Sequence, residues 1–385
     1  MKITRATVYS LKCDDFDFAY ADASAWKSGR ILHLLEIELD NGLSGWGEWG
    51  WYIGLGEVPP VPDFTPAFAC LTDKDPLAQA DRFREFAVQP GTTNFMLAAV
   101  DMALWDLRGK IAGLSLSQLL GGALRPDIPV YASLQNYRDI DDPQAWVVEL
   151  VEQHYDAGFR AFKMKIGGAA IADDCAYIQA VRDCLGARDG GSRIPLAVDA
   201  NQTYTRSEAR QMGRFLEQAN NIAWFEEPLI RADISGYRSL RQTLDVPIAG
   251  AEGCGTAGDV DGYLRAEALD VIQPDLLAVG GITPMLDICA LGRLYHVPVY
   301  VHCFFGCIER IAALHLMALQ PTWGSPLRGL HEALLEWETS CFPARDALLT
   351  ETFHPNDQGR IAVPTGPGLG VAICRECIEA YLWRS

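Results

Sequence analysis

The sequence predicts an eight-stranded β/α barrel preceded by a small α+β domain. From residue 128 onward, eight short apolar runs begin at intervals of 23 to 37 residues, and each interval is long enough for a crossover helix. Before that point the pattern differs, because strand-like runs come first and helical spacing follows. Eight strand-and-helix units over roughly 210–230 residues match the size of an eightfold β/α barrel.

The N-terminal region supplies the elements of the α+β domain. Residues 31–48 contain two apolar runs joined by Asp40-Asn41-Gly42, which is a hairpin signal. Residues 75–88 and 92–120 then place apolar side chains at helical spacing. We therefore expect an antiparallel start followed by helices, within a domain that covers residues 1–125.

The eight apolar runs are the predicted barrel strands, over residues 126–345. They span Ile128–Leu134, Phe159–Ile166, Ile194–Asn201, Ile222–Pro228, Val246–Gly253, Leu269–Leu276, Val297–Phe304 and Leu334–Glu338. Segments between them, such as Asp174–Leu185 and Arg206–Gln218, have helical spacing. A doubly wound open sheet is the competing fold, but no Gly-rich nucleotide turn follows an early strand.

Composition restricts the class of partner. The 385 residues are 49% hydrophobic, which is enough apolar side chain for a packed core. Lys and Arg number 32 against 50 Asp and Glu, so the formal charge is −18, and such a surface repels nucleic acid and anionic lipid. No stretch reaches the ~18 uncharged apolar residues of a membrane span. We expect a cytoplasmic protein with a small-molecule substrate, no nucleic acid partner and no membrane partner.

The 11 cysteines are an odd number and lie in apolar segments, as expected of core thiols in a reducing compartment. Cys374 and Cys377 have C-x-x-C spacing, which is found in metal and redox sites. No second pair and no nearby histidine joins them. We therefore interpret this pair as one face of a C-terminal helix.

Polar side chains lie near the carboxyl end of seven successive apolar runs. They are Lys163, Lys165, Asp199, Asn201, Glu226, Glu227, Glu252, Asp275, His302 and Glu336. Solvated loop residues would explain any one of them. Because barrel enzymes carry their catalytic residues at the carboxyl ends of the strands, the repetition at the strand period predicts an active site there.

Three of these carboxylates predict a metal site. Asp199, Glu226 and Glu252 come from successive strands, and three converging carboxylates repel one another unless a cation joins them. An all-oxygen ligand set favours Mg²⁺, with Mn²⁺ possible and Zn²⁺ less suited because no His or Cys takes part. The pattern does not decide between Glu226 and Glu227, since alternate strand residues point to opposite faces.

Two further pairs predict acid and base groups. Lys163 and Lys165 are two apart on an apolar strand, so they share a face, and neighbouring ammonium groups near a metal lower each other's pKa. Asp275 and His302 end adjacent strands, where the carboxylate would fix the imidazole tautomer and raise its basicity. The alternatives are lysines that cover the barrel exterior and a histidine that is only a satisfied core residue.

The motifs that contain these residues resemble the mandelate racemase subgroup of the enolase superfamily along essentially the whole chain. They are Lys163-Met-Lys165, Val198-Asp199-Ala-Asn201, Trp224-Phe-Glu226-Glu227-Pro228, Ala249-Gly-Ala-Glu252, Gln273-Pro-Asp275, Gly280-Gly281-Ile282-Thr283, His302, Glu336 and Gly366-Pro-Gly-Leu-Gly370. One departure is Ala251, where relatives often have Gly before the metal ligand; we expect little change from it.

The resemblance implies a role for each site residue. Asp199, Glu226 and Glu252 would hold Mg²⁺, the first glutamate of the Glu226-Glu227 pair being the ligand. Lys165 and the His302–Asp275 dyad would act as acid and base on opposite faces of the substrate, and Lys163 and Glu336 would hold its carboxylate or enolate oxygens. Asn201 is a predicted substrate-binding residue of the same strand ends.

The resemblance also implies that the N-terminal domain caps the barrel and carries two specificity loops. These are Asp14–Arg30 and Trp46–Pro60, with Phe16, Phe18, Tyr20, Trp26, Glu48, Trp49, Trp51 and Tyr52. Glu48 and Trp26 are the predicted substrate contacts among them, although such aromatic residues can equally serve packing. The C-terminal segment, residues 346–385, would pack back on the capping domain.

The expected activity is Mg²⁺-dependent removal of the α-proton of a carboxylate through an enolate. Residues 30–48 and 335–343 look most like those of the galactarolactone cycloisomerases, so we expect an acid-sugar dehydratase or a sugar-acid lactone cycloisomerase. A racemase or epimerase of a 2-hydroxy acid is the alternative, and a non-catalytic sugar-acid-binding protein is a remote one. Relatives of this kind are commonly symmetric assemblies, so a homo-oligomer is expected.

Overall fold

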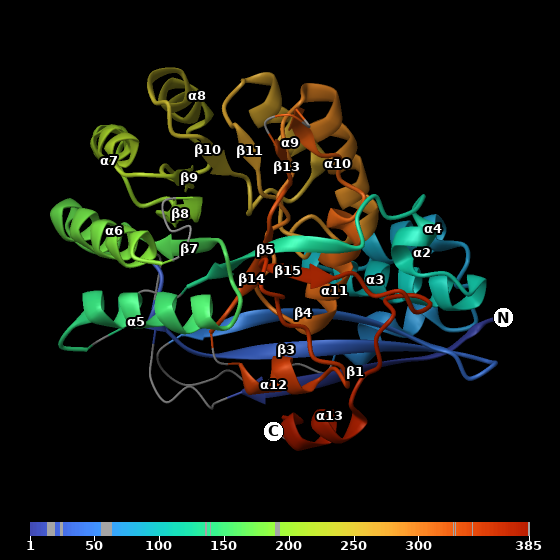
Figure 1. Ribbon diagram of the computed structural model, residues 1–385. Helices are drawn as coiled ribbons and strands as arrows, with labels where there is room; N and C mark the ends of the chain where they lie inside the picture. The colour runs from blue at the N-terminus through green and yellow to red at the C-terminus, as the bar shows by residue number, and fades with distance from the viewer. Residues whose placement is uncertain are drawn as a thin grey trace.

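The computed structural model describes residues 1–13, 20–23, 26–54, 64–134, 137–138, 140–188, 193–325, 327, 329–340 and 342–383. It contains a parallel sheet curled into a barrel, with helices outside it, and a long antiparallel sheet packed against one side (Figure 1). No helix among these residues is long and apolar enough to cross a membrane. The predicted combination of a β/α barrel with an N-terminal α+β domain is confirmed.

The barrel strands are short, and each is followed by a helix. The strands are β5 (Asp127–Ser133), β7 (Phe162–Lys165), β8 (Leu196–Asp199), β9 (Ile222–Glu226), β10 (Ile248–Gly250), β11 (Val271–Ile272) and β14 (Leu335–Glu338). The helices are α5 (Pro143–Asp156), α6 (Ile171–Gly186), α7 (Arg206–Gln218), α8 (Ile234–Thr243), α9 (Ala257–Arg265), α10 (Ile282–Tyr295) and α11 (Cys307–Met317). Strand order is β11-β10-β9-β8-β7-β5-β14.

Seven of the eight predicted barrel runs contain a strand, and one does not. Residues 297–304 run parallel to β11 but make only isolated bridges, between Ile272 and Val299 and between Asp275 and His302. The run is apolar enough to be buried, so sequence pattern alone could not distinguish it from a regular strand. Its position beside β11 still places His302 next to the strand end that carries Asp275.

The N-terminal domain has three long antiparallel strands with β3 in the middle: β1 (Ile3–Cys13), β3 (Trp26–Leu39) and β4 (Ser44–Gly54). The predicted hairpin is β3–β4, whose turn contains Gly42 at φ +84°. The predicted helices are α2 (Gln79–Ala87) and α3 (Asn94–Ala112).

The second predicted helical segment is interrupted. Gly113 ends α3 in the left-handed conformation, at φ +69°, and Ser115 starts α4 (Leu116–Leu119) with a capping box to Gln118. One expected helix is therefore two.

The remaining elements are short. They are β2 (Tyr20–Ala21), α1 (Thr65–Phe68), the 3₁₀ turn η1 (Ala69–Leu71), β6 (Tyr137–Arg138), β12 (Trp323–Ser325), β13 (Gly329–His331), α12 (Pro343–Ala347), β15 (Arg360–Ala362) and α13 (Arg375–Tyr381).

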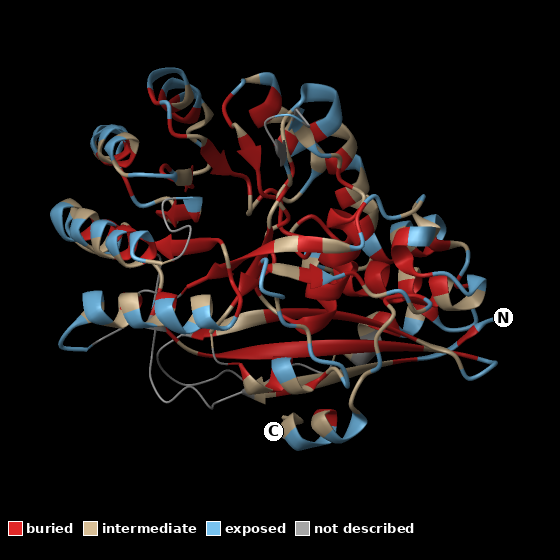
Figure 2. Cartoon of the chain, in the orientation of Figure 1, coloured by how far each residue is buried: buried red, intermediate tan, exposed pale blue. Residues whose placement is uncertain are grey.

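The C-terminal segment returns to the N-terminal sheet. Arg375, at the start of α13, pairs with the buried Glu36 of β3, and Trp383 donates its amide to Ser10 of β1 at 2.8 Å. Cys374 and Cys377 are free thiols at the beginning of α13, in agreement with the helix interpretation. Figure 2 shows buried residues along the barrel strands and along the long antiparallel sheet.

Candidate functional site

The strand ends bring the predicted charged residues together. Lys163 and Lys165 lie on β7, Asp199 ends β8, Glu226 ends β9 and Glu252 follows β10 by two residues. Asp275 and His302 form the bridge beyond β11, and Glu336 lies on β14. All of these side chains except Glu252 and His302, which are partly exposed, are buried, because the strands that carry them are the core of the barrel.

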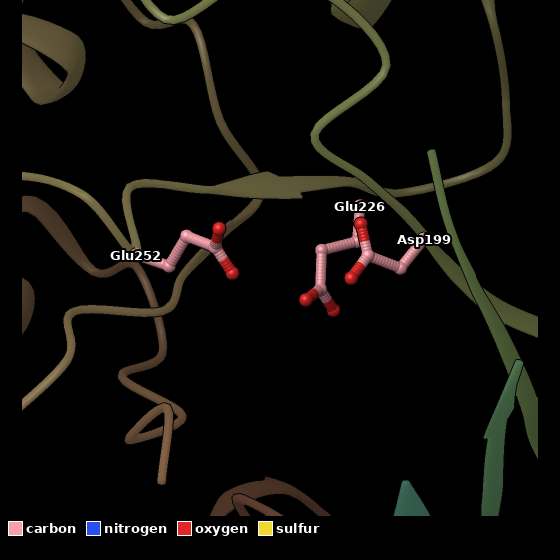
Figure 3. Close-up of side chains that lie close together, drawn as sticks. All are labelled: Asp199, Glu226 and Glu252. Atoms are coloured by element: carbon pink, nitrogen blue, oxygen red, sulfur yellow. The ribbon is translucent and has the colours of Figure 1, made fainter. Parts of the chain in front are cut away.

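The three predicted ligand carboxylates converge on one point. Asp199, Glu226 and Glu252 each offer an oxygen that lies within 4.8 Å of the other two, and among the described residues this is the one such group (Figure 3). Burial disfavours the Asp199 carboxylate, but the charges of Lys165 and Lys163 and the hydrogen bonds to Asp199 together outweigh burial and hold its pKa below the usual range. An all-carboxylate set of this size suits a hard divalent cation that completes its shell with water or substrate oxygens.

The choice between the two adjacent glutamates is made by the backbone. Glu226 Oε2 accepts hydrogen bonds from Trp224 Nε1 at 2.8 Å and from Gln273 Nε2 at 2.7 Å, which aim its other oxygen into the site. Glu227 instead has φ +37°, and its carboxylate lies 3.5 Å from Arg231 Nε. Burial is the main reason that the pKa of Glu226 is raised, to about 7.

Lys163 and Lys165 both point toward carboxylates. The Lys163 ammonium lies 2.7 Å from Glu226 Oε1 and 2.8 Å from Glu336 Oε1, and that of Lys165 lies 2.5 Å from Asp199 Oδ2. Burial opposes the charged form of Lys165, but the charges of Asp199, Glu252 and Asp22 together outweigh burial and raise the lysine pKa above its usual range. Lys163 does lower that pKa, yet the net shift is opposite to the one expected from two neighbouring ammonium groups.

The predicted dyad has the geometry of a hydrogen bond. His302 Nδ1 lies 2.6 Å from Asp275 Oδ2, which leaves Nε2 3.3 Å from Glu252 Oε2 and 3.4 Å from Glu336 Oε2. Burial disfavours the imidazolium, but the charge of Glu336 and the bond to Asp275 outweigh burial and raise the pKa of His302 to about 10. The imidazole therefore holds a proton that it can donate from Nε2.

Four of these residues border a cavity of about 430 Å³ between the barrel and the N-terminal domain. Its lining residues are Asp22, Lys27, Tyr52, Phe95, Lys165, Asn201, Gln202, Arg231, Glu252, Gly253, Asp275, Ala278, His302, Phe304 and Phe305. Among the predicted substrate contacts, Asn201 lines this cavity, whereas Trp26 and Glu48 do not. Trp26 is 40% exposed and Glu48 is fully buried below the surface of the cavity wall.

Three charged lining residues were not singled out from the sequence: Asp22, Lys27 and Arg231. Lys27 lies above the Tyr52 ring at 3.9 Å and pairs with Asp22, and Arg231 lies 3.6 Å from Glu252. Lys27 falls inside the predicted first loop, so its position was a usable signal; nothing in the pattern marked Arg231. Phe16 and Phe18 of the first loop, and residues 55–60 of the second, lie outside the described residues.

The departure at Ala251 is visible in the backbone. Ala251 has φ +88°, a conformation that favours glycine because it has no Cβ. The residue next to the ligand Glu252 is therefore held in a strained conformation. The positive φ explains why glycine suits position 251. The backbone beside Glu252 is therefore more strained than we expected from the sequence.

The chain matches known proteins over nearly its full length. A family model described as "Mandelate racemase / muconate lactonizing enzyme, N-terminal domain" matches residues 26–121, and one described as "Enolase C-terminal domain-like" matches residues 146–377. The D-galactarolactone cycloisomerase of Agrobacterium fabrum is 32% identical over 395 aligned positions, with 99% of each chain covered.

Solved structures agree. The 3,6-anhydro-D-galactonate cycloisomerase from Zobellia galactanivorans matches with a TM-score of 0.82 and 28% identity, over 100% of both chains. The L-talarate dehydratase from Polaromonas sp. JS666, complexed with Mg and L-glucarate, matches with a TM-score of 0.80 and 28% identity, over 100% of this chain and 98% of that one. The chain is therefore a member of the mandelate racemase and muconate lactonizing enzyme family, in the enolase superfamily.

Proposed function

We propose that this enzyme removes the α-proton of a sugar acid or sugar-acid lactone and then eliminates an oxygen from the neighbouring carbon. It is thus an acid-sugar dehydratase or a lactone cycloisomerase. The observation that carries the proposal is the order of the strands: the three that bear Asp199, Glu226 and Glu252 lie between β7, with Lys165, and the run with His302. An acid and a base are thus separated by one group of carboxylates.

The cofactor of the proposed reaction is Mg²⁺, held by Asp199, Glu226 and Glu252. The fit rests on the donor set, which is three carboxylate oxygens within 4.8 Å of one another and no nitrogen or sulfur ligand. When bound, Mg²⁺ supplies a Lewis acid that stabilises the negative oxygens of the enolate.

Lys165 is the proposed base, in its neutral form, and His302 is the proposed acid. Lys165 lines the cavity on one side of the carboxylates, within reach of an α-proton of a substrate bound there. His302 lines it on the other side, with Nδ1 bonded to Asp275 and Nε2 free to protonate the departing β-hydroxyl or lactone oxygen. Lys163 is the proposed contact of the substrate's carboxylate or enolate oxygens, and Glu336, 2.8 Å from its ammonium, holds Lys163 in place.

The substrate class is supported by the relatives and by the cavity. The relatives named above act on galactarolactone, anhydrogalactonate and talarate, which are acid sugars or their lactones. The cavity has charged and amide groups of Lys27, Arg231 and Asn201 available to hydroxyl and carboxylate groups, and Tyr52 and Phe304 cover its apolar side. About 430 Å³ suits one small polar molecule.

Proton NMR in D₂O tests the proposal. Aldonic acids, aldaric acids and their lactones are each incubated with the enzyme and Mg²⁺, and both α-proton exchange and new products are followed. A keto-deoxy acid or a ring-opened lactone product is the expected result. Exchange with inversion and no elimination would instead establish a racemase or epimerase, which two groups on opposite sides of one α-carbon also permit. Absence of exchange on every compound, with Mg²⁺ bound, would contradict the proposal.

Three coarser expectations stay proposals beside this one. The division into residues 1–125, 126–345 and 346–385 is supported by the contacts of α13 with the N-terminal sheet. A homo-oligomer and a cytoplasmic location are predicted from the sequence. Size-exclusion chromatography with light scattering measures the first of these two directly.

A further inference from the structure

The turn that follows His302 is held by carboxylates on its barrel side. Cys303 donates its amide to Glu336 Oε2 at 3.2 Å, and Phe305 donates its amide to Glu309 Oε2 at 3.0 Å. Glu309 belongs to the first turn of α11, so this bond joins the turn to the helix that follows it. Residues 303–306, which we call the His302 turn, are thus attached to a site residue at one end and to a helix at the other.

The N-terminal domain holds the same turn from the other side. Arg30 of β3 donates to the carbonyl oxygen of Phe304 at 3.3 Å, and its guanidinium lies 4.6 Å from the centre of the Phe304 ring. The ring of Tyr52, on β4, lies 5.6 Å from that of Phe304 and 5.1 Å from that of Phe305. Two adjacent strands of the N-terminal sheet therefore contact the residues that immediately follow His302.

Glu48 makes the central contact of this interface. Its Oε1 accepts the backbone amide of Glu309 at 2.7 Å, at the beginning of α11. A Cβ on Gly306 would lie 2.2 Å from both carboxylate oxygens of Glu48, so the close approach requires glycine there. Glu48 is fully buried and does not line the cavity, and its carboxylate faces Gly306 and the amide of Glu309.

We propose that Glu48 is a positioning residue for His302, through the turn that joins them, and not a substrate contact. Its carboxylate fixes the start of α11, and the start of α11 fixes Phe305 through Glu309. The His302 turn then keeps the imidazole Nε2 at its 3.4 Å distance from Glu336 Oε2. Glu48, in the N-terminal domain, thereby positions His302, the proposed acid of the barrel. This inference rests on the proposed function of His302.

The alternative is that Glu48 only stabilises the contact between the two domains. Asp106 provides the matched control, because it is a buried carboxylate of the same domain that also accepts backbone amides. It binds the amides of Trp46 at 3.1 Å and Leu369 at 2.9 Å, so it fastens the C-terminal segment and does not touch the His302 turn. A purely structural defect should appear equally in variants of either residue.

The test compares product formation with α-proton exchange in D₂O, using D-galactarolactone and galactarate as probes with Mg²⁺. Exchange requires Lys165 and elimination also requires His302, so their ratio does not depend on how much enzyme is folded. We expect Glu48→Ala to lower the product-to-exchange ratio about tenfold or more, since a displacement near 1 Å has effects of this size. Glu48→Gln, which keeps an acceptor oxygen, should restore the ratio to within about threefold of the wild type. Asp106→Ala should lower both rates together.

Two results would overturn the proposal. One is an unchanged product-to-exchange ratio in Glu48→Ala. The other is a ratio in Glu48→Gln as low as that in Glu48→Ala, which would indicate that the charge of Glu48 itself acts on the substrate. If Glu48→Ala does not fold, Glu48→Asp takes its place, because it withdraws the oxygens by one methylene.

A second measurement does not depend on the substrate. Hydrogen–deuterium exchange of residues 302–309, with Mg²⁺ alone, should be faster in Glu48→Ala than in Glu48→Gln or Asp106→Ala. Equal protection in all three variants contradicts the proposal even if neither probe is turned over. The wild-type enzyme could convert neither probe while amide hydrogen–deuterium exchange still differs among the variants as expected. That result would count against the proposed substrates and not against the role of Glu48.

Discussion

Two buried clusters of charged side chains share strand β14 and are built in opposite ways. Glu336 belongs to the site, where five carboxylates surround two lysines and one imidazole. Glu338, two residues further along, lies in a cluster where three arginines approach one carboxylate. Those arginines are Arg30, Arg310 and Arg345.

The charge of Glu338 is balanced by protein groups. Glu338 Oε2 lies 3.0 Å from Arg30 Nη1, and Glu338 Oε1 accepts the amide of Ser340 at 2.8 Å. Burial would raise the pKa of Glu338, but Arg30 and Arg345 outweigh it and hold the pKa well below its usual range. In the site, negatively charged side chains outnumber positively charged ones. The three converging carboxylates therefore require a cation from outside the chain.

The difference teaches that burial of charge does not by itself identify a functional site. Both clusters lie on the same strand, and both hold a glutamate whose pKa is lowered, that of Glu336 to about 2 because Lys163 and His302 outweigh burial. The sign of the surplus charge and the presence of converging ligand oxygens separate them. The following predictions test this distinction.

The largest effect is expected at the base. Lys165→Ala should lower turnover of any substrate found in the NMR panel by about 10³-fold or more, because it removes the proposed proton acceptor. The fold should remain, as judged by circular dichroism. Lys74→Ala, on the surface of the N-terminal domain, is the control and should keep wild-type activity. Undiminished turnover in Lys165→Ala would remove this residue from the mechanism.

The arginine cluster should affect stability and not metal binding. Glu338→Gln leaves buried arginines without their carboxylate, so we expect the free energy of unfolding to fall by about 3–5 kcal/mol. Urea denaturation measures this change. Mg²⁺ affinity of the folded variant, measured by calorimetry, should stay close to that of the wild type. A large loss of Mg²⁺ affinity with little loss of stability would mean that the two clusters are not separate.

Glu48 should make stability depend on pH. Burial raises its pKa from 4.5 to about 7, although the amides of Glu309 and Ile308 act in the opposite direction. The folded protein then binds a proton that the unfolded chain releases, so this contribution is fully present below about pH 4.5 and is lost as the pH rises through about 7. It amounts to about 3 kcal/mol.

The matched variants isolate this contribution. Relative to Glu48→Gln, the wild type should lose stability between pH 4.5 and 8, as measured by denaturation at several pH values. The exposed Glu149→Gln serves as a control whose difference from the wild type should not follow that trend. A constant difference between Glu48→Gln and the wild type across the range would show that Glu48 keeps its charge throughout.

The smallest expected effect concerns the metal ligands. Asp199→Asn removes one of three carboxylates, so Mg²⁺ affinity should fall by about tenfold or more, because ligand charge sets the affinity of such sites. Calorimetric titration with Mg²⁺ alone measures it. Glu351→Gln, an exposed carboxylate of the C-terminal segment, is the control. Unchanged affinity in Asp199→Asn would place the cation elsewhere.

Much of the fold followed from pattern, because period and spacing are local properties of the chain. The β3–β4 hairpin and the helices α6 and α7 lie where the sequence placed them. Residues 297–304 were expected as a strand and are not one, since an apolar run predicts burial but not a partner. The break at Gly113 depends on a single left-handed residue inside a helical pattern.

The candidate site divides in the same way. Residues at strand ends could be placed by counting, because every parallel strand of a barrel ends on the same face; Asp199, Glu252 and His302 are examples. Glu48 could not be placed, because its partner amide at Glu309 is 261 residues away and belongs to the other domain. Arg231 reaches Glu252 from a loop whose path no local pattern specifies.

The sequence by itself therefore determined the barrel, the family and the set of charged residues at the strand ends. Only the tertiary structure decided that Glu227 lies beside Arg231, that Asp199 contributes to a raised pKa of Lys165, and that Glu48 binds a helix start instead of the cavity. The physical reason is that periodicity fixes the face of each element, whereas proton affinity and contact depend on distances between elements. Those distances are set by packing of the two domains against each other.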